Sequence, residues 1–189
     1  MKIPFILEAS VLAMLSFIGA GLLPKGAVTA SGPVSGMASG SDDQSQNDAV
    51  FLADAAGGEM MEVELGQLAQ LNSLDPVIKD LGSRMVKDHG QDGDRIKALS
   101  AARNIRVPSV LTDERQKIKE GLQKKTGTEF DREYIKLVID DHLKTIRQFE
   151  KEAAGGSDKE IRAFADSSLH MLHAHLEAAQ NYQKTVVKE

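Results

Sequence analysis

Histidines are the residues of this chain whose types and spacing could do chemistry. Three of the five fall within the stretch LHMLHAHL at residues 169–176, and the other two, His89 and His142, stand alone. Imidazole nitrogens bind metals and exchange protons near neutral pH. The chain has no cysteine, so the ligands of any metal site must be histidine, carboxylate or methionine. Whether the histidines share a site depends on the direction of each ring, and therefore on the secondary structure.

The periodicity of apolar residues predicts helices. From residue 48 to about 186 apolar side chains recur at three- and four-residue spacing, without the alternation typical of strands. Asp75 followed by Pro76 marks one helix start, Thr112 marks another, and Ser157 with Glu160 predicts a capping box. The predicted helices span residues 48–71, 76–103, 113–125 and 128–154, with a last helix from the Ser157 cap to about 186.

This order of helices predicts the fold class. Four long helices form two hairpins, and a long connection with its own short helix joins them. That pattern is typical of an all-α, ferritin-like four-helix bundle. We expect it to occupy residues 48–187.

The first thirty residues have the features of a targeting segment. Lys2 precedes the apolar run VLAMLSFIGAGLL at 11–23, and Val28 and Ala30 provide the small residues found before a cleavage point. We therefore expect a signal peptide at 1–30 and export to the periplasm or outer envelope. A membrane anchor is the alternative, but the run is shorter than the roughly 20 residues of a span, so we expect no transmembrane span in the mature form. The Gly- and Ser-rich residues 31–47 predict a disordered linker.

Charge and motifs exclude several function classes. The formal net charge is −5 and no basic block is present, which argues against nucleic acid or an anionic membrane surface as a partner. The sequence contains no Gly-rich phosphate loop and no nucleophile elbow. It identifies no protein partner and leaves homo-oligomerisation open.

Helical wheels separate the histidines into two groups. At 100° per residue, His175 falls on the apolar face of the last helix, whereas His170 and His173 fall on the solvent side. Each of the four long helices then carries one inward metal-binding residue. These residues are Glu62, His89, His142 and His175.

These four residues predict a metal site in the bundle core. A buried carboxylate needs a partner, and a metal or the histidines would supply one. Three imidazoles and one carboxylate suit a single Zn, Fe, Cu, Ni or Mn ion. Asp88 and Asp141 each precede an inward histidine, and we expect them to accept the outer N–H of a ligand rather than to bind the metal. The Glu-x-x-His pairs of di-iron bundles are absent, which disfavours oxygen-activating chemistry.

Two alternatives remain open from the residues. In one, Glu62 and the histidines form a buried hydrogen-bond network in a structural or interaction bundle that binds no metal. In the weaker one, a metal with an open coordination position makes the protein an oxidoreductase or hydrolase. We identify no catalytic residue, and enzymatic activity stays undecided.

Several stretches resemble the domain-of-unknown-function 4142 family (DUF4142). They are FLADAAGGEMMEVELGQLA at 51–69, MVKDHGQ at 85–91, FDREYIKLVIDDHLKTIRQFEKEA at 130–153 and LHMLHAHLEAA at 169–179. The resemblance implies a ferritin-like bundle in a secreted bacterial protein, often described as an outer membrane protein. The family pattern matches Glu62, His89, His142 and His175, but it typically has proline at the position of His170. It implies no established reaction.

Overall fold

The computed structural model describes residues 39–186, with side chains from 45 to 185. The described region is helical, contains no strand, and has no helix long and apolar enough to cross a membrane. The predicted signal peptide and most of the predicted linker lie outside it. The helices are α1 (Ser39–Asn72), α2 (Pro76–Ala102), α3 (Asp113–Gln123), α4 (Gly127–Gly155) and α5 (Lys159–Val186).

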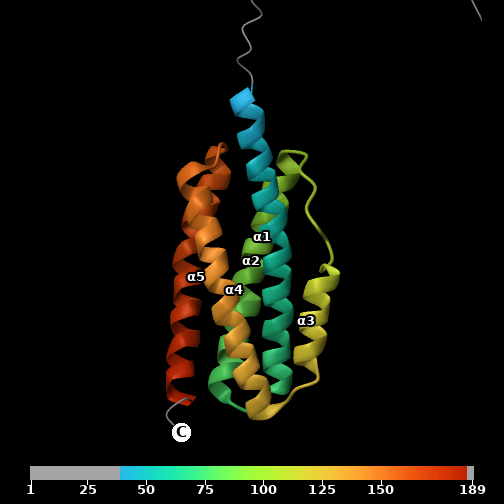
Figure 1. The fold of residues 1–189 in the computed structure, drawn as a ribbon, viewed down its shortest axis with the longest axis vertical. Helices are drawn as coiled ribbons and strands as arrows, with labels where there is room; N and C mark the ends of the chain where they lie inside the picture. Colours follow the sequence, from blue (N-terminus) through green and yellow to red (C-terminus); the bar gives the residue numbers. More distant parts are fainter. Residues whose placement is uncertain (1–38, 187–189) are drawn as a thin grey trace, which may run out of the picture. The chain divides into compact units, whose positions relative to one another are not determined.

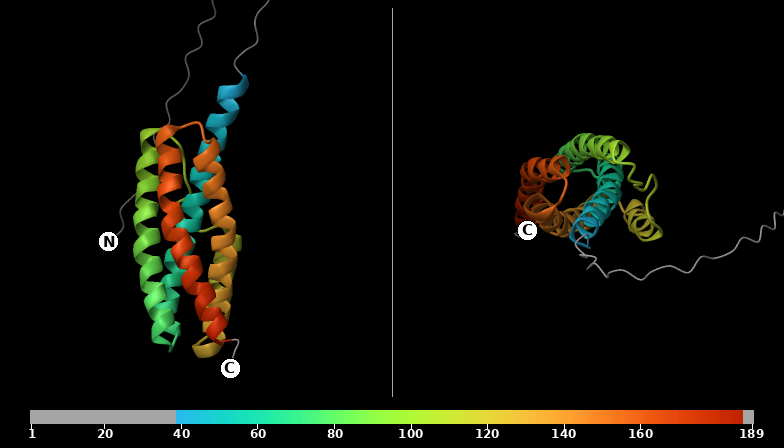
Figure 2. Two further views of the ribbon diagram at one scale, coloured as in Figure 1. Left: turned by 90° about the vertical axis from the view of Figure 1, so that its left-hand side faces the viewer. Right: turned by 90° about the horizontal axis from the view of Figure 1, so that it is seen from above.

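Two antiparallel hairpins form the bundle, as the order of helices predicts. The α1–α2 hairpin and the α4–α5 hairpin pack side by side, with α1 against α4 and α2 against α5 (Figure 1). The connection between the hairpins runs back along the bundle, and α3 lies on its outside against α1 (Figure 2). Each long helix therefore faces a common interior.

Local capping explains two of the helix starts. The Asp75 side chain accepts a hydrogen bond from the Val77 N–H at 2.8 Å, and Pro76 is the first helical residue. The Thr112 side chain caps α3 by accepting from the Arg115 N–H at 3.3 Å. Both N-caps are confirmed. Each leaves fewer unpaired N–H groups at its helix start.

Other predicted boundaries were wrong. Helix α1 begins at Ser39, inside the segment predicted as linker, because extending an existing helix costs far less than nucleating one. Helix α4 begins at Gly127 rather than Thr128. The predicted Ser157–Glu160 capping box is replaced by Asp158, whose carboxylate accepts hydrogen bonds from the N–H groups of Glu160 and Ile161.

The core is apolar and continuous along the bundle. Phe51 and Phe149 pack edge to face with ring centroids 4.9 Å apart, which joins α1 to α4. Helices α1 and α2 approach closely where Gly66 meets Gly82. A Cβ built on either glycine would lie 2.7 Å from the carbonyl oxygen of the other. This approach brings the inner faces of α1 and α2 together about two turns from His89.

Candidate metal centre

The four inward residues predicted from the helical wheels are buried in the bundle. Glu62 of α1, His89 of α2, His142 of α4 and His175 of α5 are each at most 3% exposed. His170 and His173 are exposed on α5, as the wheel predicts. The dense cluster in the sequence is therefore not a cluster in space.

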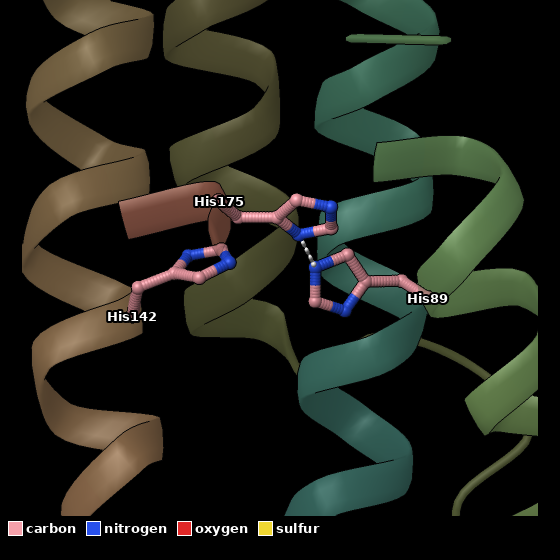
Figure 3. Close-up of side chains that lie close together, drawn as sticks. All are labelled: His89, His142 and His175. Atoms are coloured by element: carbon pink, nitrogen blue, oxygen red, sulfur yellow. Dashed lines mark hydrogen bonds between the residues drawn. The ribbon is translucent and has the colours of Figure 1, made fainter. Parts of the chain in front are cut away.

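The rings of His89, His142 and His175 converge at one level (Figure 3). One ring nitrogen from each lies within 4.8 Å of the other two, and the ring centroids are 5.2 to 5.6 Å apart. Among the described residues, these three form the only group of histidines and carboxylates with such spacing. Glu62 is not part of the group.

The other nitrogen of each ring faces a hydrogen-bond acceptor. Nδ1 of His89 lies 2.6 Å from the Glu59 carboxylate. Nδ1 of His142 lies 2.9 Å from the carbonyl oxygen of Val138, and Nε2 of His175 lies 3.1 Å from the Asp88 carboxylate. Each acceptor fixes the ring proton on its own side. The lone pairs of His89 Nε2, His142 Nε2 and His175 Nδ1 are then left for the centre.

This proton arrangement conflicts with a direct hydrogen bond inside the group. His175 Nδ1 and His89 Nε2 lie 3.3 Å apart, as the dashed line in Figure 3 marks. A hydrogen bond between them needs a proton on one of these two nitrogens. That ring would then either become a cation or give up its outer acceptor. A metal cation between the nitrogens would remove the conflict.

The electrostatics keep the rings of His142 and His175 neutral. Burial, followed by the neighbouring His89 and His175, lowers the pKa of His142 to about 3. Burial, with the adjacent His89, lowers the pKa of His175 to about 4. Neutral imidazole is the form that binds metals, so both rings are in the ligand form well below pH 7.

Glu62 lies at the outer edge of the His142 ring. Its Oε1 is 3.7 Å from His142 Nδ1, which already has the Val138 carbonyl oxygen as a closer acceptor. The Glu62 carboxyl group lies beside that of Asp141, and no hydrogen-bond donor in the described part of the chain reaches either of its oxygens. Burial, followed by the negative charge of Asp141, raises the pKa of Glu62 well above its ordinary value.

The two predicted supporting aspartates have different neighbours. Asp88 contacts His175 of α5 rather than the adjacent His89. Asp141 lies beside Glu62 and accepts a hydrogen bond from the Thr145 hydroxyl at 3.3 Å. Sequence reasoning did not identify Glu59 as a partner of a site histidine. Glu59 lies three residues before Glu62, a spacing that places both on one side of α1.

The family assignment follows from a sequence match over most of the chain. Residues 34–182 match the model of the domain of unknown function DUF4142. The protein belongs to the DUF4142 family. No curated protein matches this DUF4142 chain in sequence.

Two solved structures share the fold of this DUF4142 bundle. One is CopM in its Cu(I)-bound form, with a TM-score of 0.63 and 16% identity, covering 73% of this chain and 96% of CopM. The other is a conserved hypothetical protein, Rv2844, from Mycobacterium tuberculosis. It has a TM-score of 0.56 and 13% identity, covering 74% of this chain and 92% of that chain. At these identities the likeness shows a common helical-bundle fold.

The three ring nitrogens of this DUF4142 centre are suitable donors for one metal ion. Nitrogen atoms around one metal, bonded at about 2.0 to 2.1 Å, are separated by roughly 3.5 Å in a trigonal arrangement. The pair from His89 and His175, at 3.3 Å, already has nearly this spacing. The third ring must approach by roughly 1 Å, which a small change in side-chain torsion supplies.

Proposed function

We propose that this DUF4142 protein binds one transition-metal ion in the bundle core through His89, His142 and His175. The observation that carries the proposal is the orientation of the three rings. Each directs one nitrogen to a common point, and each has an acceptor on its other nitrogen. Acceptors of this kind hold ligand histidines in the binding tautomer in metalloproteins.

The donor set narrows the choice of ion. Three imidazoles suit copper, zinc, iron or nickel, whereas manganese prefers oxygen ligands. We place copper and zinc first. CopM, a neighbour in fold, was solved with Cu(I). Zinc sites are usually four-coordinate, so a zinc ion would need one more ligand. Glu62 is the candidate for this fourth ligand, because its buried carboxyl group lies next to His142. To bind the ion, the Glu62 side chain would have to turn toward the centre.

We infer that the protein is exported and that it holds or buffers the metal in the periplasm or outer envelope. The apolar run at 11–23 and the small residues Val28 and Ala30 support export. Mass spectrometry of the protein recovered from the periplasmic fraction would test this. A mature form beginning near residue 31 is expected, and an intact cytoplasmic chain beginning at Met1 would contradict export.

Equilibrium metal titration tests the binding proposal. Tag-free protein, stripped of metal, is titrated with Zn²⁺ and, under anaerobic conditions, with Cu⁺, in competition with a chromogenic chelator. We expect one ion per chain and a raised Tm, because a ligand that binds only the folded state stabilises it. His89→Ala and His175→Ala should abolish the binding.

His170→Ala is the matched control, since His170 is an exposed histidine on the same helix as His175. It should keep both stoichiometry and affinity. Absence of binding by either ion, with an unchanged Tm, would refute the metal proposal and favour a buried hydrogen-bond network. Equal loss of binding in the control would show that the ions bind surface histidines instead.

A further inference from the structure

A small cavity lies beside His89 and His142 and is lined by both buried and exposed residues. Its volume is about 20 Å³, enough for one water molecule. Its lining includes the buried Glu62 and His142 at one end and the exposed Asp54 and Lys144 at the other. The cavity therefore spans the wall formed by α1 and α4.

Carboxylates dominate the inner part of this cavity. Glu59, Glu62 and Asp141 line it beside His89 and His142. Both oxygens of the buried Glu62 lack a hydrogen-bond partner in the described structure. Carboxyl oxygens are ligands for a passing cation, and the positive charge of a nearby cation favours their ionised form. The cavity thus offers oxygen ligands along the way to the three nitrogens.

The side chain of Arg115 forms part of the lining of the cavity. Arg115 belongs to α3, and its guanidinium rests on α1 directly over Gly57. A Cβ built on Gly57 would overlap Nη1 of Arg115, so the guanidinium can occupy this place only because residue 57 has no side chain. Gly58, the next residue, also lines the cavity, but a Cβ there would meet nothing within 4 Å.

Helix α3 is fixed to the bundle through residues other than Arg115. Lys119 forms an ion pair with Glu64 of α1 at 2.7 Å, and Leu122 is buried. The Asn72 side chain donates to the carbonyl oxygens of Gln123 and Lys125 at the end of α3. The Arg115 side chain can therefore move without detaching the helix, and such side-chain motions take nanoseconds or less.

We propose that this cavity is the path by which the metal ion reaches the three histidines, and that Arg115 closes its outer end. The inference rests on the proposed metal binding. Glu62 and Asp141 act as transient oxygen ligands on the way in. Arg115 blocks the mouth by its size and repels the cation by its charge, so its side chain must swing away from Gly57 for the metal to pass.

A second groove reaches the centre from another side but is a poorer path. It lies between the α1–α2 hairpin and residues 107–111 and has a volume of about 870 Å³. It touches His89 where the Glu59 carboxylate already holds Nδ1. The metal-facing nitrogen of that ring is on the opposite edge, and most of the accessible lining of the groove is apolar.

Stopped-flow kinetics with Zn²⁺ alone tests the path. Uptake is measured with metal-free protein, and release is measured by transfer from the loaded protein to excess chelator. Arg115→Met removes the charge and loosens the block. Gly57→Ala keeps the charge but displaces the guanidinium. Both variants should accelerate uptake and release together, each by about tenfold, which corresponds to roughly 1.4 kcal/mol in the barrier.

The rate of metal release distinguishes a physical block of the cavity by Arg115 from a purely electrostatic effect of its charge. Loss of a nearby positive charge would by itself slow the release of a cation, whereas opening a path accelerates release. Lys119→Met is the matched control for the attachment of α3, and Gly58→Ala is the control for a methyl group added to α1. Neither control should accelerate either rate.

Specific outcomes overturn the proposal. Unchanged or slower release in Arg115→Met, or equal acceleration in Lys119→Met, would show that Arg115 does not close a path. These outcomes leave the metal site itself intact, since equilibrium affinity is measured separately. Wild-type protein that binds no Zn²⁺ at equilibrium would instead refute both the zinc site and the path to it.

Discussion

The carboxyl group of Glu152 should make the stability of the bundle depend on pH. Glu152 is 7% exposed on α4 and shares a hydrogen bond with the Asp48 carboxyl of α1. Burial alone would raise the pKa of Asp48, but hydrogen bonds from Ser157 and Asp158 lower it. Burial, followed by the charge of Asp48, raises the pKa of Glu152 to about 7. Asp48 is then the carboxylate, and Glu152 keeps the shared proton.

The sign and size of the effect follow from this shift. The pKa of Glu152 is about 7 in the folded protein, against an ordinary value of 4.5. Between these values the folded state holds a proton that the unfolded state has lost, so stability falls as pH rises through the window. At 1.36 kcal/mol per pKa unit, the loss is at most about 3 kcal/mol. The loss is complete once the pH is clearly above the folded pKa of about 7, where two carboxylates face each other.

Glu152→Gln should remove this dependence, because the amide can still donate to Asp48 but cannot ionise. The free energy of unfolding is measured by urea denaturation, followed by circular dichroism at 222 nm, at pH 5, 6, 7 and 8. We expect the variant to gain stability relative to wild type across this range and to be more stable at pH 8. Comparing the two proteins cancels the titration of the buried histidines and of the other carboxyls.

Glu150→Gln is the control, since Glu150 is an exposed glutamate on the same helix. Its difference from wild type should stay constant with pH. Parallel profiles for wild type and Glu152→Gln would refute the assignment of the shared proton. So would a wild type that is the more stable of the two at pH 8.

Three further predictions follow from other contacts. Gly82→Ala should destabilise the protein by about 2 kcal/mol or more in urea denaturation, because the new methyl group would meet the Gly66 carbonyl oxygen. Gly121→Ala, where the methyl group has open space around it, should stabilise the protein by roughly 0.5 to 1 kcal/mol. Asp88→Asn should weaken metal affinity in competition titrations by about 10- to 100-fold, while Asp141→Asn should change it far less, since Asp88 holds a ligand ring and Asp141 does not. The His142 ring, whose pKa burial lowers to about 3, should show no NMR titration above pH 4 in metal-free protein, and a shift near pH 6.5 would contradict its burial as a neutral ring.

Much of the fold could be predicted from local signals in the sequence. The apolar period and the caps at Asp75 and Thr112 act within a few residues, so the sequence reports them directly. The cap of α5 could not be assigned this way. Ser157 and Asp158 are both good capping residues, and Asp48, more than a hundred residues earlier, binds the N–H of each. The contact with Asp48 thus determines which of the two possible residues caps α5.

The direction of the rings could also be predicted, but not which of them meet. A helical wheel gives the face of each residue, and all four inward residues are buried. Their mutual distances also depend on helix tilt and on the level of each residue along the bundle. Counted from the connecting loop, the two residues of each hairpin differ in level by about one turn. Asp88 illustrates the limit. Its sequence neighbour is His89, yet its contact is His175, because adjacent helical positions diverge by 100°.

The unpaired polar atoms of the core give the strongest argument that a cation belongs at this centre. Among the described residues, eight buried side-chain atoms have no hydrogen-bond partner. Three of them are Nε2 of His142, which faces the centre, and the two oxygens of Glu62, which lie at the outer edge of the same ring. Each such atom costs about 1 to 3 kcal/mol if it stays unpaired. A buried network without metal would have to carry this cost beside two lone pairs facing each other at 3.3 Å. One metal ion at the convergence point would pair the three ring nitrogens and place a positive charge near the Glu62 carboxyl group, which would favour its ionised form.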